Sequence, residues 1–107
     1  MIRIVYNRPH HRLTVVGHAG SAPHGEDLVC AAVSGLVLAL GANVHRLQEL
    51  GVARDVVNLQ EDGGAEIACN CKKKHEATVA LIFDVICLGL SELAEDYPEF
   101  ITMETRG

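Results

Sequence analysis

The segment from Leu28 to Val44 constrains the fold more than any other part of the chain, because it carries no charged side chain and consists mainly of Ala, Gly, Val and Leu. Asp27 precedes it as an expected helix N-cap, and Gly51 supplies a C-terminal stop, so the pattern predicts one long helix. A helix that is apolar nearly all round is buried on more than one side. Since its small side chains permit close approach, we expect it to pack against its own copy in a homodimer.

Length and composition favour a single folded domain over residues 1–107. A chain of 107 residues with 49% hydrophobic and 21% charged residues is not disordered. A domain of this length buries roughly two thirds of its unfolded surface, so an active site would be shallow or shared between subunits. No stretch reaches the roughly 18 uncharged apolar residues that cross a bilayer, and the N-terminus lacks a signal-peptide pattern. We therefore expect a cytoplasmic protein that does not bind membranes.

The net charge of -5 argues against nucleic acid as a partner, because phosphate binding needs a clustered excess of Lys and Arg. The one basic run is Lys72 to Lys74. An acidic domain instead attracts basic proteins or peptides. Disulfides are rare in the cytosol, so we expect none among the four cysteines. These are Cys30, Cys69, Cys71 and Cys87.

The hydrophobic patterning predicts an α+β fold. Four strands are expected over residues 1–7, 11–16, 52–60 and 65–71. The last two flank Asp62-Gly63, a strong hairpin signal. A second helix is expected over about 74–96, and residues 98–105 are compatible with a short final strand. Its apolar stripe comprises Val79, Ile82, Phe83, Ile86, Leu90 and Leu93. The β-β-α-β-β-α order predicts a two-layer domain, an antiparallel sheet with two helices on one face.

The stretch GHAGSAPHGED, from Gly17 to Asp27, is the first place to expect chemistry. It has three glycines and no large apolar side chain. Connections in compact domains have a median of about 4 to 6 residues, and longer ones tend to be functional. Glycines adopt positive φ at little steric cost, which lets such a loop order around an extended peptide.

Cys30 follows this loop, in what we expect to be the first turn of the long helix. Unpaired backbone N–H groups and the helix dipole lower a thiol pKa there from about 8.5, and the same groups can donate to an oxyanion. His18, at the start of the loop, is placed to take the thiol proton. On residue type alone, Cys30 is a small core hydrophobe and His18 a loop residue without catalytic role. Their joint placement favours a Cys–His dyad.

Asp27 and Ser34 lie three residues before and four residues after Cys30, and so share its helix face. Asp27 either caps the helix or orients His18. A direct contact with the sulfur would oppose thiolate formation. Ser34 either positions a water or substrate group, or is a small residue that lets another helix approach.

The segment GHAGSAPHGEDLVCAAVS closely resembles the signature of the ribosomal-processing cysteine protease family Prp, whose pattern is GHA-G-A-G-D-CAA-S. The resemblance extends over nearly the whole chain, to a Tyr-Pro-aromatic-Ile element that begins at Tyr97. It implies a bacterial endopeptidase that removes an N-terminal extension from a large-subunit ribosomal protein. Family members form homodimers, and their motif loop is thought to close around the peptide.

The resemblance also implies the roles of individual residues. Cys30 is expected to be the nucleophile and His18 the general base and acid, with Asp27 and Ser34 in supporting roles. The residues of the substrate-contacting loop are then Gly17, Ala19, Gly20, Ser21 and Gly25. We expect the chemistry to need no cofactor.

The remaining cysteines and histidines suggest weaker alternatives. Cys69, Cys71 and His75 supply three ligand types, but structural zinc needs four ligands and no fourth is obvious nearby, so we expect no metal site. Cys87 is expected in the core, and His24 is the loop histidine that could touch substrate. A thiol redox protein is disfavoured because no Cys-x-x-Cys motif is present. The principal rival is a binding module or chaperone that docks a basic ribosomal protein without cleaving it.

Overall fold

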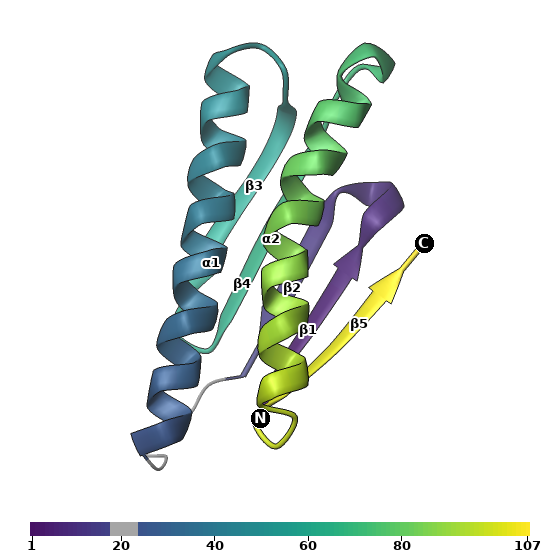
Figure 1. Ribbon diagram of the computed structural model, residues 1–107. Helices are drawn as coiled ribbons and strands as arrows, with labels where there is room; N and C mark the ends of the chain where they lie inside the picture. The colour runs from purple at the N-terminus through teal and green to yellow at the C-terminus, as the bar shows by residue number, and fades with distance from the viewer. Residues whose placement is uncertain (18–23) are drawn as a thin grey trace.

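The computed structural model describes residues 1–17 and 24–107, and of residues 24–27 the backbone alone. Five strands form one sheet in the order β3-β4-β2-β1-β5, and two long helices cover one face of it (Figure 1). The strands are β1 (Ile2–Asn7), β2 (Arg12–Val16), β3 (Arg54–Glu61), β4 (Gly64–Asn70) and β5 (Ile101–Arg106). The helices are α1 (His24–Glu49) and α2 (Glu76–Asp96), with short 3-10 helices η1 (Arg8–His10) and η2 (Lys73–His75). The α+β, two-layer prediction is confirmed.

Both predicted hairpins are present. β1 pairs antiparallel with β2, and its alternation places Ile2, Ile4 and Tyr6 in the core. β3 pairs antiparallel with β4 through a turn at Asp62-Gly63, where Gly63 has a φ of +83°. Glycine reaches this left-handed conformation without the steric cost that a side chain would add.

The expectation of a purely antiparallel sheet is wrong, because β5 lies parallel to β1. The pairing sets Ile2 beside Ile101, and the N–H of Ile2 donates to the carbonyl oxygen of Phe100 at 2.8 Å. Parallel strands need a long crossover connection, which the intervening chain supplies. The apolar pattern of a strand identifies its buried face but leaves its direction open.

The first helix begins earlier than the sequence predicted. α1 starts at His24, so Asp27 is its fourth residue, and the prediction that Asp27 is the N-cap is wrong. Acidic residues are favoured in a first helical turn, which suits Glu26 and Asp27 at these positions. The predicted C-terminal stop is confirmed, since the helix ends at Glu49 and Gly51 has a φ of +75°.

The hydrophobic core lies between the sheet and the helices. α1 contributes one face to it, made by Val29, Val33, Val37, Leu40, Val44 and Leu47. The predicted stripe of α2 is confirmed in position, with Val79, Phe83 and Leu90 buried and its other three members partly buried. Cys87 is buried beside them, as expected for a core cysteine.

The helix layer leaves a large apolar surface exposed in the single chain, which we call the outer helix face. Its residues are between 61% and 64% exposed and comprise Leu28, Leu38, Leu81, Val85 and Leu88.

The expectation that no segment is apolar enough to cross a membrane is wrong, because both long helices are apolar enough to do so by length and composition. In the single chain only one side of each helix is buried against the core.

Candidate active site

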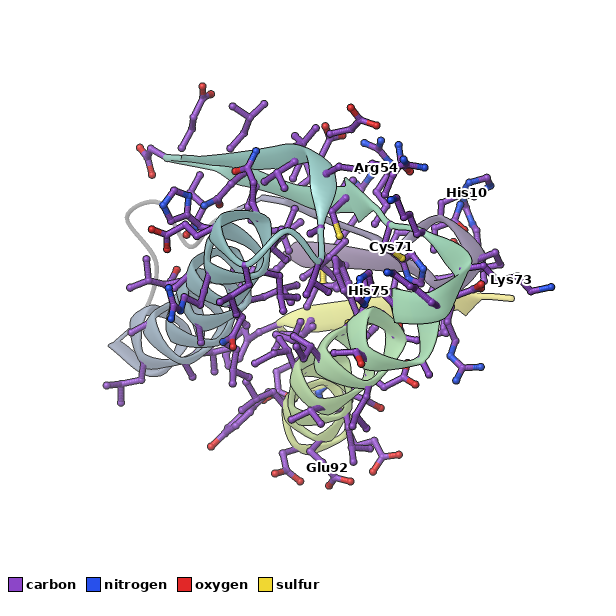
Figure 2. The ribbon with its side chains drawn as sticks, turned by 90° about the horizontal axis from the view of Figure 1, so that it is seen from above. His10, Arg54, Cys71, Lys73, His75 and Glu92 are labelled. Atoms are coloured by element: carbon purple, nitrogen blue, oxygen red, sulfur yellow. The ribbon has the colours of Figure 1, made fainter. Side chains whose placement is uncertain are left out.

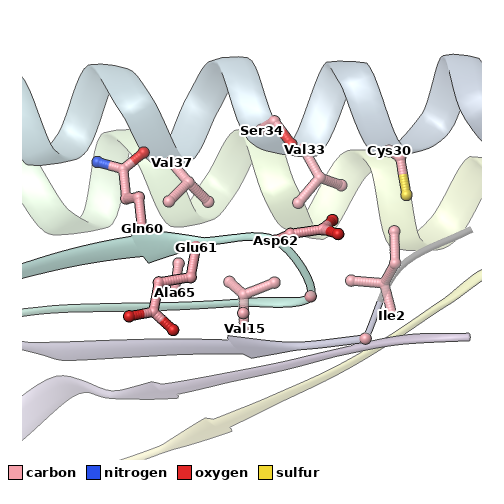
Figure 3. Close-up of a pocket in the computed structure, with 13 residues that line it drawn as sticks. Ile2, Val15, Cys30, Val33, Ser34, Val37, Gln60, Glu61, Asp62 and Ala65 are labelled. Atoms are coloured by element: carbon pink, nitrogen blue, oxygen red, sulfur yellow. The ribbon is translucent and has the colours of Figure 1, made fainter. Parts of the chain in front are cut away.

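A cavity of about 310 Å³ opens between α1 and the turn that joins β3 to β4 (Figure 3). Cys30 is half-buried and lines it, and Ser34 lines it from the same helix. Gly17, at the end of β2, forms part of the opposite wall. The structure therefore brings together three of the residues singled out from the sequence, at the end of the sheet where the motif begins.

The sequence predicted Cys30 in the first helical turn, and this prediction is wrong. Cys30 is the seventh residue of α1, and only the first four N–H groups of a helix lack an intrahelical partner. The influence of the helix dipole also falls off within the first turn. The end of α1 therefore does not supply the oxyanion donors or the thiolate stabilisation expected from its N-terminus.

The other motif residues fall in three groups. His18, Ala19, Gly20 and Ser21 lie outside the described residues. Asp27 is described by its backbone, one helical turn before Cys30. Gly25 is the second residue of α1, so its predicted place in a loop is wrong.

Gly17 anchors the start of the motif to the β3–β4 turn. Its N–H donates to the carbonyl oxygen of Gly63 at 2.9 Å, directly beyond the β2–β4 pair of Val16 and Gly64. Its φ is +106°, and a Cβ at this position would collide with the carbonyl oxygen of Met1. Only glycine fits both constraints, so the residue before His18 holds a fixed place on the cavity wall.

The β3–β4 turn contributes a cavity residue that the sequence analysis missed. Asp62 lines the cavity together with Cys30, and Figure 3 shows its carboxylate directed from the turn towards the Cys30 side. The carboxylate of the adjacent Glu61 points away, to the other side of the sheet (Figure 3). In the sequence the Asp-Gly pair indicates a turn and nothing more, because only the pairing of β2 with β4 brings this turn to the motif.

The remaining thiols lie elsewhere. Cys69 and Cys87 are buried, and burial raises their pKa to about 11 and about 12. Cys71 is half-buried at the opposite end of the sheet, where it shares a cavity with Lys73 (Figure 2), and burial raises its pKa too. Within the described part of the chain, no three His, Cys, Asp or Glu side chains are grouped to hold a metal ion.

The sequence and the fold are similar over almost their whole length to known cysteine proteases. A family model described as Cysteine protease Prp matches residues 1–102. The chain is 37% identical over 97 residues to the ribosomal processing cysteine protease Prp of Mycoplasma pneumoniae. The matched region covers 89% of this chain and 87% of that protein. The crystal structure of SMU.848 from Streptococcus mutans is 32% identical, with a TM-score of 0.70 over 98% of this chain and 91% of that one.

A crystal structure of the essential ribosomal processing protease Prp from S. aureus, in complex with a substrate peptide, has the same fold. Its TM-score is 0.72 at 22% identity, over 99% of this chain and 100% of that chain.

Proposed function

Because the chain belongs to the cysteine protease Prp family, we propose that Cys30 is its nucleophile and that His18 is its general base and acid. The observation that carries this proposal is the half-buried thiol of Cys30 in the wall of an open cavity. His18 directly follows Gly17, which is fixed in the lining of the same cavity. A nucleophilic thiol needs a base within reach and a concave surface that can receive a peptide.

In the proposed reaction, the imidazole of His18 takes the thiol proton of Cys30, and the thiolate attacks the carbonyl carbon of the scissile bond. His18 then returns the proton to the leaving amine as the C–N bond breaks, which leaves a thioester on Cys30. Water attacks the thioester carbonyl and gives a proton to His18. The C–S bond breaks and releases the new carboxylic acid, which ionises in water, while His18 returns its proton to the thiolate.

Position in the cavity supports a role for Ser34. Ser34 lines it beside Cys30, and we propose that its hydroxyl binds the substrate or the hydrolytic water. We propose that Asp27 orients His18. The loop residues proposed to contact the peptide are Gly17, Ala19, Gly20 and Ser21. Since Cys30 lies beyond the first helical turn, the oxyanion donors must come from elsewhere than the end of α1.

We propose that the substrate is the N-terminal extension of a large-subunit ribosomal protein, cleaved in the cytoplasm. The names of the relatives support ribosomal processing as the setting. The net charge of -5 supports a basic substrate, because ribosomal proteins bind RNA through Lys and Arg. No nucleic acid or membrane takes part in the proposed reaction.

Incubation with the extended ribosomal protein from the same genome tests this proposal. We expect a shortened product with a new N-terminus, detected by mass spectrometry, and loss of at least about 90% of the activity after alkylation with iodoacetamide, because the thiolate is the nucleophile. A partner that is bound with unchanged mass would identify the protein as a binding module instead. Cleavage that continues after complete alkylation would contradict a thiol mechanism.

We also propose that the protein is a homodimer joined through the outer helix face. Monomeric soluble proteins rarely expose large continuous apolar patches, and such patches mark interaction sites. On this face Leu38 of α1 is 63% exposed, and Leu88 of α2 is 64% exposed. A second copy supplies a matching surface, because a two-fold interface brings the same patch together from both subunits.

A charge at Leu38 tests the homodimer. We expect Leu38→Glu to weaken self-association at least about tenfold, because it buries an unpaired carboxylate in the interface. Size-exclusion chromatography with light scattering gives the mass at about 10 µM. The matched control is Leu59→Glu, since Leu59 is 56% exposed on the other face of the sheet and should leave the dimer intact. A wild-type monomer at this concentration would contradict the proposal.

A further inference from the structure

We infer that the cavity beside Cys30 is a subsite for a lysine side chain of the substrate peptide, with Asp62 as the acceptor of its ammonium group. The inference rests on the proposed function, because it assumes that a peptide lies across Cys30. Beyond that function, it identifies the residue of this chain that distinguishes between peptides and the kind of substrate side chain that this residue binds.

The floor of the cavity is apolar and suits the methylene stem of a lysine. Within the cavity of about 310 Å³, five aliphatic residues from the sheet and from α1 form this floor: Ile2, Val15, Val33, Val37 and Ala65. Lysine side chains pack their stems along such surfaces while the charged end stays at a polar rim. The shape therefore accepts a long unbranched side chain and requires a polar partner at its end.

Asp62 supplies that partner. Its carboxylate is directed into the cavity on the Cys30 side (Figure 3), and the described residues give it no hydrogen bond or ion pair. The described residues that line the cavity include no Lys, Arg or His that would neutralise it. An ammonium group is therefore attracted there, and a substrate carboxylate is repelled.

The turn that carries Asp62 is held in place next to the motif. Gly63 accepts the hydrogen bond from Gly17 at 2.9 Å, and Gly64 pairs with Val16 at the end of the β2–β4 ladder. These contacts fix the backbone on the C-terminal side of Asp62 relative to the start of the loop that contains His18. A carboxylate on a fixed turn selects charge at a defined distance from the scissile bond, because its position does not adjust to the peptide.

The test uses a set of peptides spanning the extension of the ribosomal protein, with one position at a time near the cleavage site set to lysine, norleucine or glutamate. Norleucine keeps the apolar stem and removes the ammonium group. Binding to the Cys30→Ala protein is measured by calorimetry, and cleavage is measured with the wild-type thiol. At one position we expect lysine to bind about twofold to fivefold more tightly than norleucine, as is typical of an ion pair with an exposed carboxylate.

The Asp62→Asn variant should bring the lysine to norleucine ratio at that position to about 1, and Asp62→Lys should favour glutamate instead. The matched control is Asp55→Asn, the same substitution at the other end of the β3–β4 hairpin, where the carboxylate accepts a hydrogen bond from Asn70. It should leave the ratio unchanged. High salt should reduce the ratio in the wild type, since Asp62 is exposed to solvent.

Two results separate the inference from the proposed function. Cleavage of all peptides with no preference for lysine at any position, or a preference that survives Asp62→Asn, would overturn the inference and leave the protease intact. A lysine preference in binding without cleavage would uphold the subsite and overturn the protease. If no peptide binds and none is cleaved, both are wrong.

Discussion

Replacing Cys30 with alanine is expected to lower kcat/KM for the extended ribosomal protein by at least about 10⁴-fold. The variant keeps the cavity and loses the atom that forms the thioester, and losses of this order follow removal of one member of a catalytic constellation. Single-turnover assays with mass spectrometry of the product measure the loss. Binding of the substrate peptide should persist, because the five aliphatic residues of the cavity floor are unchanged.

The control for this prediction is the other half-buried cysteine. Cys71 lies at the opposite end of the sheet from Cys30, and burial raises its pKa, which disfavours its thiolate form. Cys71→Ala should retain activity within about twofold, because Cys71 lies away from the cavity that contains Cys30. Cleavage by Cys30→Ala at the wild-type rate, or loss of cleavage in Cys71→Ala alone, would refute the assignment of the nucleophile.

Local patterns predicted the elements of this fold well. The alternation in β1 identified its buried face, and the Asp-Gly pair after β3 identified a hairpin. The three-residue and four-residue spacing in α2 found the stripe around Phe83. Each of these signals is contained within one element, so it can be recognised without knowledge of the rest of the chain.

Relations between distant segments could not be predicted in the same way. The parallel pairing of β5 with β1 depends on how the chain crosses the sheet, and the place of Asp62 beside Cys30 depends on the pairing of β2 with β4. The start of α1 was misplaced because an aspartate in a first helical turn and an aspartate at an N-cap have the same local signal. Because of this error, Cys30 was expected in the first helical turn, where free backbone N–H groups would stabilise its thiolate and bind an oxyanion.

Phe83 is the residue whose truncation is expected to destabilise the fold most. It is 0% exposed at the centre of the core, and its ring lies 6.1 Å from that of Tyr6, nearly parallel to it, and 6.0 Å from that of His11. Phe83→Ala should lower the free energy of unfolding by about 3–5 kcal/mol, through lost burial and the cavity that remains. Small domains have about 5–15 kcal/mol in total.

A loss in the upper part of that range is expected, because the ring of Tyr6 cannot move into the space that Phe83 leaves. Burial raises the pKa of Tyr6, so its hydroxyl stays protonated, and it donates to Asp84 at 2.7 Å. Arg8 in turn donates to both carboxylate oxygens of Asp84. Urea unfolding at one protein concentration measures the change, with Leu59→Ala on the exposed sheet face as a control that should stay within about 0.5 kcal/mol. A loss below about 1 kcal/mol for Phe83→Ala, with an unchanged m-value, would show that the core relaxes around the missing ring and would contradict this account of a pinned Tyr6.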